Sequence, residues 1–121
     1  MTLVDTSVWV EFLHGHPGAT RLATLLERGE VLVHPWVVGE LTLGAAGKQR
    51  VRFLADMGLL PQAAVLTNEE TLEVIVAQQL AGRGVGWVDA NLLGSALLSQ
   101  SALWTRDRNL GLVVRAAGLA G

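Results

Sequence analysis

The sequence predicts an α/β fold, in which a parallel β-sheet carries helices on both faces. Short apolar segments alternate with one or two longer segments of helical periodicity, which indicates strands joined by right-handed crossovers. The chain has 121 residues, a length typical of one domain, and half of them are hydrophobic, so a sizeable core can form.

The first strand and the first two helices are expected before residue 30. Residues 3–4 form a short apolar strand, and a helix then starts at Thr6 or Ser7. A loop with proline and glycine follows at residues 15–18. Residues 19–29 predict a helix, because three leucines fall on one face and a glycine ends the segment.

The second strand is expected at residues 31–33. Pro35 suits the first turn of the helix that follows it, and Gly44 and Gly47 end that helix. A further helix covers residues 48–58 and stops at a glycine.

The remaining elements are two strands and three helices. Apolar residues 63–66 predict a third strand, and Thr67 with Glu70 then fits a capping box that opens a helix. Asp89 opens the next helix. A fourth strand is expected at residues 102–105 and a last helix at about 109–117.

Composition narrows the possible environments and modes of binding. The chain has no cysteine, which excludes disulfides and thiolate sites and favours a reducing cytoplasm. The first residues do not resemble a signal peptide, and no apolar run approaches the ~18 residues that a membrane span needs. The net charge is −2 and the pI is about 5.8, so any contact with nucleic acid is expected to be local or bridged by metal ions.

Four acidic residues lie where an apolar segment meets a turn or a helix: Asp5, Glu40, Asp89 and Asp107. A carboxylate beside apolar residues is costly to desolvate without a partner. The similar positions of these four suggest that the fold gathers them at the carboxyl ends of the strands, where parallel sheets bind ligands. Clustered carboxylates need protons or a cation, and oxygen ligands favour Mg²⁺ or Mn²⁺.

Helix capping is the alternative explanation for these acids. Asp5 and Asp89 each precede or open a helix and are suited to cap it, and Asp107 is suited to a turn before Asn109. Capping gives no reason for Glu40 to lie in a helix with apolar neighbours on several sides.

Other polar and aromatic residues carry weaker signals. Thr105 is either an ordinary strand residue or a group that orients Asp107. Arg106 and Arg108 flank Asp107 and either hold substrate phosphates or are solvated charges. The three histidines are too few and too scattered to favour a zinc site. The four tryptophans lie in apolar segments, which favours core packing or an interface over base stacking.

Four segments in order resemble the PIN domain, and more narrowly the VapC toxins of type II toxin–antitoxin systems: LVDTSVWVEFL, VVGEL, GVGWVDANLLGSALL and LWTRDRNL. The similarity extends over essentially the whole chain. It implies a single PIN-like domain over residues 1–121, with three α/β/α layers and a parallel sheet of four to five strands.

The resemblance also implies a function. The chain would be a Mg²⁺- or Mn²⁺-dependent endoribonuclease that hydrolyses RNA phosphodiester bonds, forms a homodimer and is inhibited by a cognate antitoxin. The catalytic residues would be Asp5, Glu40, Asp89 and Asp107, with Asp5, Asp89 and Asp107 as metal ligands. Thr6 and Thr105 would support the site, and Arg106 and Arg108 would contact substrate.

The inhibitor is expected to block the acidic pocket. Clustered carboxylates can receive a guanidinium, and apolar helix residues can form a groove for an amphipathic helix. The partner is expected to contact residues 9–12 or the helix around Val37 and Glu40, and to place a basic side chain near Asp5 and Asp89.

Two rival functions remain: a receiver-like signalling domain and a non-catalytic interaction domain that kept the fold. A receiver-like domain needs a lysine after a late strand, whereas the only lysine here is Lys48. A non-catalytic relative would lack one of the acids, and none is missing.

Overall fold

The computed structural model describes residues 1–44 and 47–121 and contains a parallel sheet. Its strands are β1 (Thr2–Val4), β2 (Val31–Leu32) and β3 (Ala102–Trp104), in the order β2-β1-β3. Leu3 at the centre lies opposite Leu32 on one side and Leu103 on the other. The predicted α/β architecture with parallel strands is therefore confirmed.

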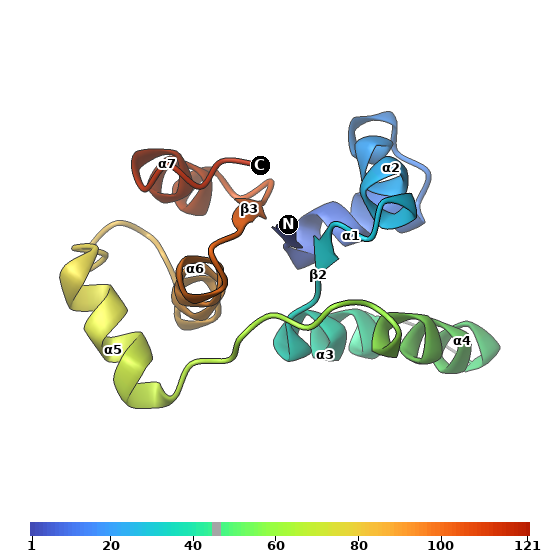
Figure 1. Cartoon of the computed structure of the whole chain (residues 1–121), viewed down its shortest axis with the longest axis horizontal. Coiled ribbons are helices and arrows are strands. Elements are labelled where there is room, and N and C mark those ends of the chain that lie inside the picture. The colour runs from blue at the N-terminus through green and yellow to red at the C-terminus, as the bar shows by residue number, and fades with distance from the viewer. Residues whose placement is uncertain (45–46) are drawn as a thin grey trace.

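Helices flank this sheet on both sides, with α1 and α2 to the right in Figure 1 and α5 and α6 to the left. The helices are α1 (Thr6–Leu13), α2 (Arg21–Glu27) after the 3-10 turn η1 (Pro17–Ala19), α3 (Pro35–Gly44), α4 (Gly47–Gly58), α5 (Asn68–Ala77), α6 (Trp87–Ser99) and α7 (Arg108–Ala116). In the described part of the chain, none of them has the length and apolar character that a membrane span requires.

The sheet is smaller than predicted: the described residues form three strands instead of four to five. The strand expected at residues 63–66 is wrong. An isolated parallel bridge instead pairs Val33 with Gln62, just before this segment: the Val33 N–H donates to the Pro61 carbonyl and the Ala63 N–H to the Val33 carbonyl. The ladder then stops because the Ala64 N–H donates to Ser99 Oγ on α6 (3.1 Å).

Helix α6 begins at Trp87, two residues before the predicted start at Asp89. Gly86 is the N-cap, in an extended conformation, so Asp89 occupies the third position of the first turn. The helix therefore starts directly after the glycine-rich segment, earlier than the position of Asp89 suggested.

Helices α5 and α6 pack closely against each other, and this contact sets the position of α6. The predicted capping box at the start of α5 is confirmed, since the Glu70 N–H donates to Thr67 Oγ1 (3.1 Å) and the Thr67 N–H to Glu70 Oε1 (2.8 Å). Between the helices, Thr71 Oγ1 donates to Asn91 Oδ1 (2.8 Å), and both residues are buried.

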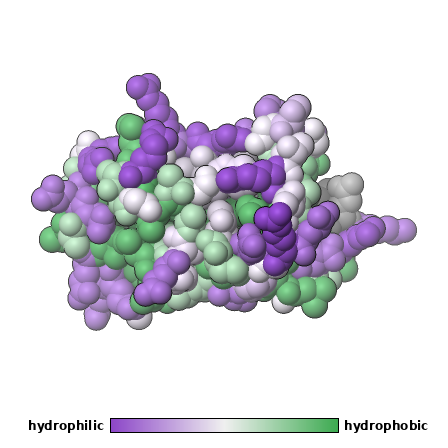
Figure 2. Space-filling model, turned by 45° about the horizontal axis from the view of Figure 1, so that its top comes forward, coloured by the Kyte–Doolittle hydropathy of each residue, from purple (hydrophilic) through white to green (hydrophobic). Residues whose placement is uncertain are grey.

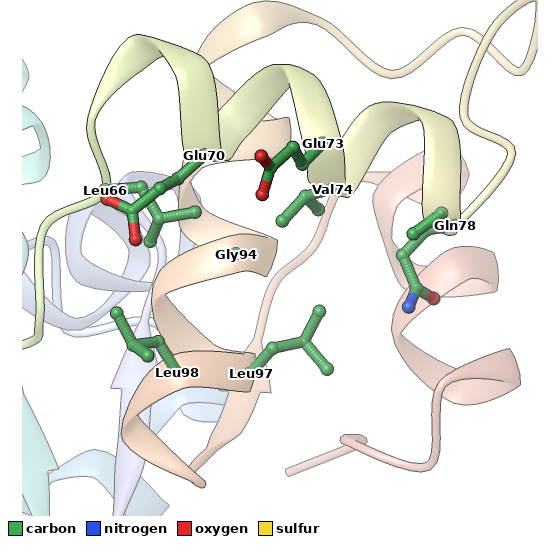
Figure 3. Close-up of a pocket in the computed structure, with 9 residues that line it drawn as sticks. Leu66, Glu70, Glu73, Val74, Gln78, Gly94, Leu97 and Leu98 are labelled. Atoms are coloured by element: carbon green, nitrogen blue, oxygen red, sulfur yellow. The ribbon is translucent and has the colours of Figure 1, made fainter.

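A small hollow of about 370 Å³ remains between these two helices (Figure 3). Gly94 of α6 permits the close approach, because a Cβ at this position would lie 2.5 Å from Leu66 Cδ2 and 3.3 Å from Val74 Cγ2. None of the four acids of interest lines this hollow.

The core surrounds the central strand β1, where Leu3 and Val4 are fully buried. Trp9 and Trp104 are also buried, as expected for core tryptophans, whereas Trp87 is 41% exposed. Apolar atoms nevertheless reach the surface among the hydrophilic side chains (Figure 2). They include Leu72 and Val76 on α5.

Candidate metal centre

The site is built at the carboxyl ends of β1 and β3. Asp5 follows β1 directly, and its N–H donates to the Trp104 carbonyl (2.9 Å), which extends the pairing of the two strands by one residue. Thr105 and Asp107 follow β3. The parallel sheet therefore brings together two segments that are about 100 residues apart in sequence.

Asp5 is only 8% exposed, and its carboxylate accepts hydrogen bonds at both oxygens. Oδ1 accepts from the Thr6 N–H (2.7 Å), and Oδ2 accepts from Thr105 Oγ1 (2.7 Å) and from Ser7 Oγ (3.2 Å). Donors of this kind compensate the cost of burying a carboxylate and fix its orientation.

The same two hydroxyls hold the loop after β3. Ser7 Oγ accepts from the Arg106 N–H (3.1 Å), and Thr105 Oγ1 accepts from the Asp107 N–H (3.0 Å). Thr105 thus connects Asp5 to the backbone of Asp107, and its supporting role in the site stays a prediction. Ser7 was not singled out from the sequence, although a hydroxyl two residues after an aspartate at a helix start is a recognisable signal.

Thr6 contributes its backbone rather than its side chain. Its N–H binds Asp5, while its Oγ1 is buried and has no hydrogen-bond partner in the described part of the chain. Its expected supporting role therefore depends on the main chain in this conformation.

Asp89 is half-buried in the first turn of α6, and its Oδ2 accepts a long hydrogen bond from the Gly86 N–H (3.4 Å). Burial raises the pKa of its carboxyl, and the negative charges of Asp5, Asp107 and Glu40 raise this pKa further, against the opposing effect of the Gly86 hydrogen bond. The fold therefore brings Asp89 within range of the negative charges of the other three acids.

Asp107 and Glu40 are exposed. Asp107 caps α7, since its Oδ1 accepts from the Leu110 N–H (2.8 Å). Glu40 lies on α3 at one end of a groove of about 570 Å³, which is lined by Val10, Leu13, His14, Leu41, Gly44, Arg52, Phe53 and Asp56 in addition to Glu40.

Capping and clustering therefore occur together in this protein. Asp5, Asp89 and Asp107 each accept from a backbone N–H at a helix start. Within residues 1–44 and 47–121, no three Asp, Glu or His side chains stand close enough to hold a metal ion in their present orientations.

The donor set nevertheless fits a hard cation. All four groups are carboxylates, the type of ligand that Mg²⁺ and Mn²⁺ prefer, and a cation would relieve the repulsion that raises the pKa of Asp89. The assignment of Asp5, Asp89 and Asp107 as ligands stays a prediction, and Asp89 and Asp107 each accept a backbone N–H through one carboxylate oxygen only.

The two arginines beside Asp107 differ in their surroundings. The Arg106 guanidinium donates through Nε to Glu11 Oε2 (2.9 Å) and through a terminal nitrogen to the Gly18 carbonyl. It therefore ties the β3–α7 loop to α1 and η1. Arg108 begins α7, is exposed, and makes no side-chain hydrogen bond or ion pair with the described residues.

Two of the histidines serve as helix caps. Nδ1 of His16 accepts from the Gly18 N–H (3.1 Å), and Nδ1 of His34 accepts from the Trp36 N–H (3.1 Å). His34 is fully buried, and burial lowers its pKa. Both residues thus have a structural explanation that needs no zinc.

The PIN domain family model matches residues 2–115 of this chain. Among curated proteins, the chain is 46% identical over 121 residues to Ribonuclease VapC32 from two strains of Mycobacterium tuberculosis, with 99% of this chain and 95% of that protein covered.

Two solved structures have a similar fold. A toxin-antitoxin complex from Klebsiella pneumoniae matches with a TM-score of 0.69 at 21% identity, covering 88% of this chain and 87% of that one. FitAcB from Neisseria gonorrhoeae matches with a TM-score of 0.65 at 18% identity, covering 95% of this chain and 94% of that one. Both agree with the α/β architecture described above.

We predict that Asp89→Asn stabilises the metal-free protein at neutral pH. A carboxyl whose pKa is raised by folding holds its proton more tightly in the folded state, so stability falls as pH rises through that pKa. The asparagine side chain would carry no charge and would keep an acceptor for the Gly86 N–H. Thermal unfolding in EDTA should therefore give a higher melting temperature for the variant at pH 7.

The advantage of Asp89→Asn should vanish below the ordinary pKa of 3.8, where the carboxyl is protonated in both the folded and the unfolded state. Added Mn²⁺ should reverse the order at pH 7, because only the wild type keeps this ligand. Glu73→Gln removes an exposed charge on α5 and is the control. An equal gain from both substitutions would assign the effect to net charge alone.

Proposed function

Because the chain belongs to the PIN domain family, we propose that it is a Mg²⁺- or Mn²⁺-dependent endoribonuclease, the toxin of a type II toxin–antitoxin system. One observation carries the proposal: the chain is 46% identical, over nearly its whole length, to a ribonuclease, and its Asp89 lies within range of the charges of Asp5, Asp107 and Glu40. We expect it to act in the cytoplasm.

Asp5, Asp89 and Asp107 would hold the metal ion. The ion would supply an acidified water as nucleophile and stabilise the negative charge on the leaving oxygen. Asp5 is suited to be the fixed ligand, because three donors already orient it.

Glu40 is suited to receive a proton from the attacking water, since it is exposed and adjoins the acidic site. A carboxylate in hydrogen-bond reach of the nucleophile is a common general base. Thr105 and Ser7 would hold Asp5 and the loop that carries Asp107 in fixed positions relative to each other. Arg108, whose side chain is exposed, would contact substrate phosphates.

A receiver-like domain fits these residues less well. Lys48, the only lysine of the chain, is an exposed residue of α4 and does not follow a late strand. A non-catalytic interaction domain remains the alternative that the cleavage assay below tests.

The cognate antitoxin would bind the groove beside Glu40. Val10, Leu13, Leu41 and Phe53 give this groove apolar walls, and Glu40 and Asp56 give it acceptors for a basic side chain. The expected contacts change in one respect: Trp9 and Val37 are buried in the core, so the exposed Val10 and Leu13 take their place.

The first prediction of this function is metal-dependent RNA cleavage. Purified protein should cut RNA with Mg²⁺ or Mn²⁺, and EDTA should stop the reaction. Asp5→Asn should slow cleavage at least about 100-fold, because losing several kcal/mol of transition-state stabilisation costs about tenfold per 1.4 kcal/mol.

Gel analysis of end-labelled RNA checks this, with Glu73→Gln as the control that should cleave normally. The acidic pI of about 5.8 predicts selective cutting, because non-specific binding to RNA is weak. Failure to cleave any cellular RNA, with metal present and antitoxin absent, would contradict the enzymatic function.

The second prediction concerns inhibition. Leu13→Glu places a charge on the apolar wall of the groove and should weaken antitoxin binding by at least about tenfold, the effect of roughly 1.4 kcal/mol. The variant should still cleave RNA but escape inhibition. Leu112→Glu on α7 is the control, because Leu112 is similarly exposed (48% against 52%) and lies outside the groove.

Titration calorimetry measures the affinity of both variants for the cognate antitoxin. Equal affinity of Leu13→Glu and Leu112→Glu would place the antitoxin elsewhere. Replacing the partner's basic residue should also release inhibition, and unchanged inhibition would refute the pocket-blocking model.

The third prediction is a homodimer that uses the exposed apolar residues of α5. Leu72 and Val76 are 54% and 77% exposed, and burying apolar residues of this kind favours association. Sedimentation velocity should give a dimer of the 12.9 kDa chain. Val76→Glu should shift it to monomer, whereas Leu59→Glu, at an 85% exposed position away from α5, should not. A wild-type monomer at high concentration would rule out the dimer.

A further inference from the structure

Two guanidinium groups approach the indole ring of Trp104, at the end of β3. Arg21 Cζ lies 4.3 Å from the ring centroid and Arg106 Cζ lies 5.8 Å from it. The carbonyl of Trp104 accepts from the Asp5 N–H (2.9 Å), and Thr105 follows directly. This pair of cations therefore adjoins the acidic site.

The two arginines differ in what neutralises them. Arg106 is bound to Glu11 and to the Gly18 carbonyl. Arg21 is an exposed residue of α2, and its guanidinium makes no hydrogen bond or ion pair with any residue in the described ranges 1–44 and 47–121. Its partner there is the indole of Trp104.

A cation held by an aromatic ring is positioned without using its donors. The ring attracts the guanidinium through its electrons, whereas the five N–H groups of an arginine point outward in the plane of the guanidinium. Arg21 is thus oriented by Trp104 and retains its hydrogen-bonding capacity.

The charges next to the acids point to a phosphate as the ligand of Arg21. An RNA strand carries one negative charge per nucleotide, and four clustered carboxylates repel it. Beside the indole of Trp104, Arg106 is paired with Glu11 whereas Arg21 is not, so Arg21 offers a phosphate a cation at the edge of the site.

We propose that Arg21 binds a backbone phosphate of the RNA next to the one that is cleaved, with Trp104 as the platform that orients it. This inference rests on the proposed ribonuclease function. A guanidinium can bind a phosphate through two parallel hydrogen bonds. A phosphate contact carries no sequence information, so Arg21 should contribute affinity without selecting the cleavage site.

The test compares Arg21→Gln with Arg28→Gln. Arg28 is the exposed C-cap of the same helix, seven residues along and on nearly the same face, and it makes no cation–π contact with an indole in the part of the chain that the structure describes. Fluorescence anisotropy with a labelled single-stranded RNA in EDTA measures binding without cleavage, over a series of KCl concentrations.

Arg21→Gln should weaken binding about threefold to tenfold and reduce the slope of log K against log salt by about 0.7, the value for one phosphate contact on a single strand. Arg28→Gln should change neither quantity appreciably. With metal present, Arg21→Gln should raise KM and leave kcat nearly unchanged. Arg21→Lys should restore the salt slope but only part of the affinity, because lysine lacks the planar fork.

Three results would overturn the proposal. If Arg21→Gln binds RNA like the wild type, Arg21 only covers the tryptophan. If Arg21→Gln and Arg28→Gln weaken binding equally, the effect belongs to the charge of α2 as a whole. In both cases the wild type would still cleave RNA, and the ribonuclease function would stand. If the wild type neither binds nor cleaves RNA, the phosphate site and the function fall together.

Discussion

The organisation of this protein depends on how one buried carboxylate is satisfied. Asp5 is almost enclosed at the end of the central strand, and it accepts from the Thr6 N–H and from the hydroxyls of Ser7 and Thr105. Because those hydroxyls also accept from the backbone of Arg106 and Asp107, the charge fixes the loop after β3 as well as its own helix. Stability and site geometry thus come from the same set of hydrogen bonds.

The acids are suited to two purposes, helix capping and metal ligation. As they stand, Asp89 and Asp107 satisfy backbone N–H groups at the starts of α6 and α7, which stabilises both helices. Burial, and then the charges of Asp5, Asp107 and Glu40, raise the pKa of Asp89, so a charged Asp89 is disfavoured without a cation. A bound cation would relieve this repulsion, and each capping carboxylate uses only one of its two oxygens for the helix.

An acidic site in a chain of net charge −2 must still attract a polyanion, and local cations provide the means. The arginines at the rim have different tasks. Arg106 is used internally, since it joins the β3–α7 loop to Glu11 and Gly18, whereas Arg21 and Arg108 remain available to solvent. Whether a side chain is available for substrate is therefore decided by which carboxylates and carbonyls the fold places beside it.

The sequence by itself determined the parallel α/β architecture, the capping box at Thr67 and the positions of the four acids, because these depend on local periodicity and short-range hydrogen bonds. It also carried the resemblance to the family, since each motif is a continuous stretch of sequence.

The sequence could not exclude a strand at residues 63–66, because the hydrogen bond that ends the ladder comes from Ser99, far along the chain. It gave no sign that Arg21 stacks on Trp104 or that Arg106 is held by Glu11, since each of these contacts joins residues from opposite ends of the chain. Contacts of this kind arise only when the chain is folded, and they decide which of the predicted residues face the substrate.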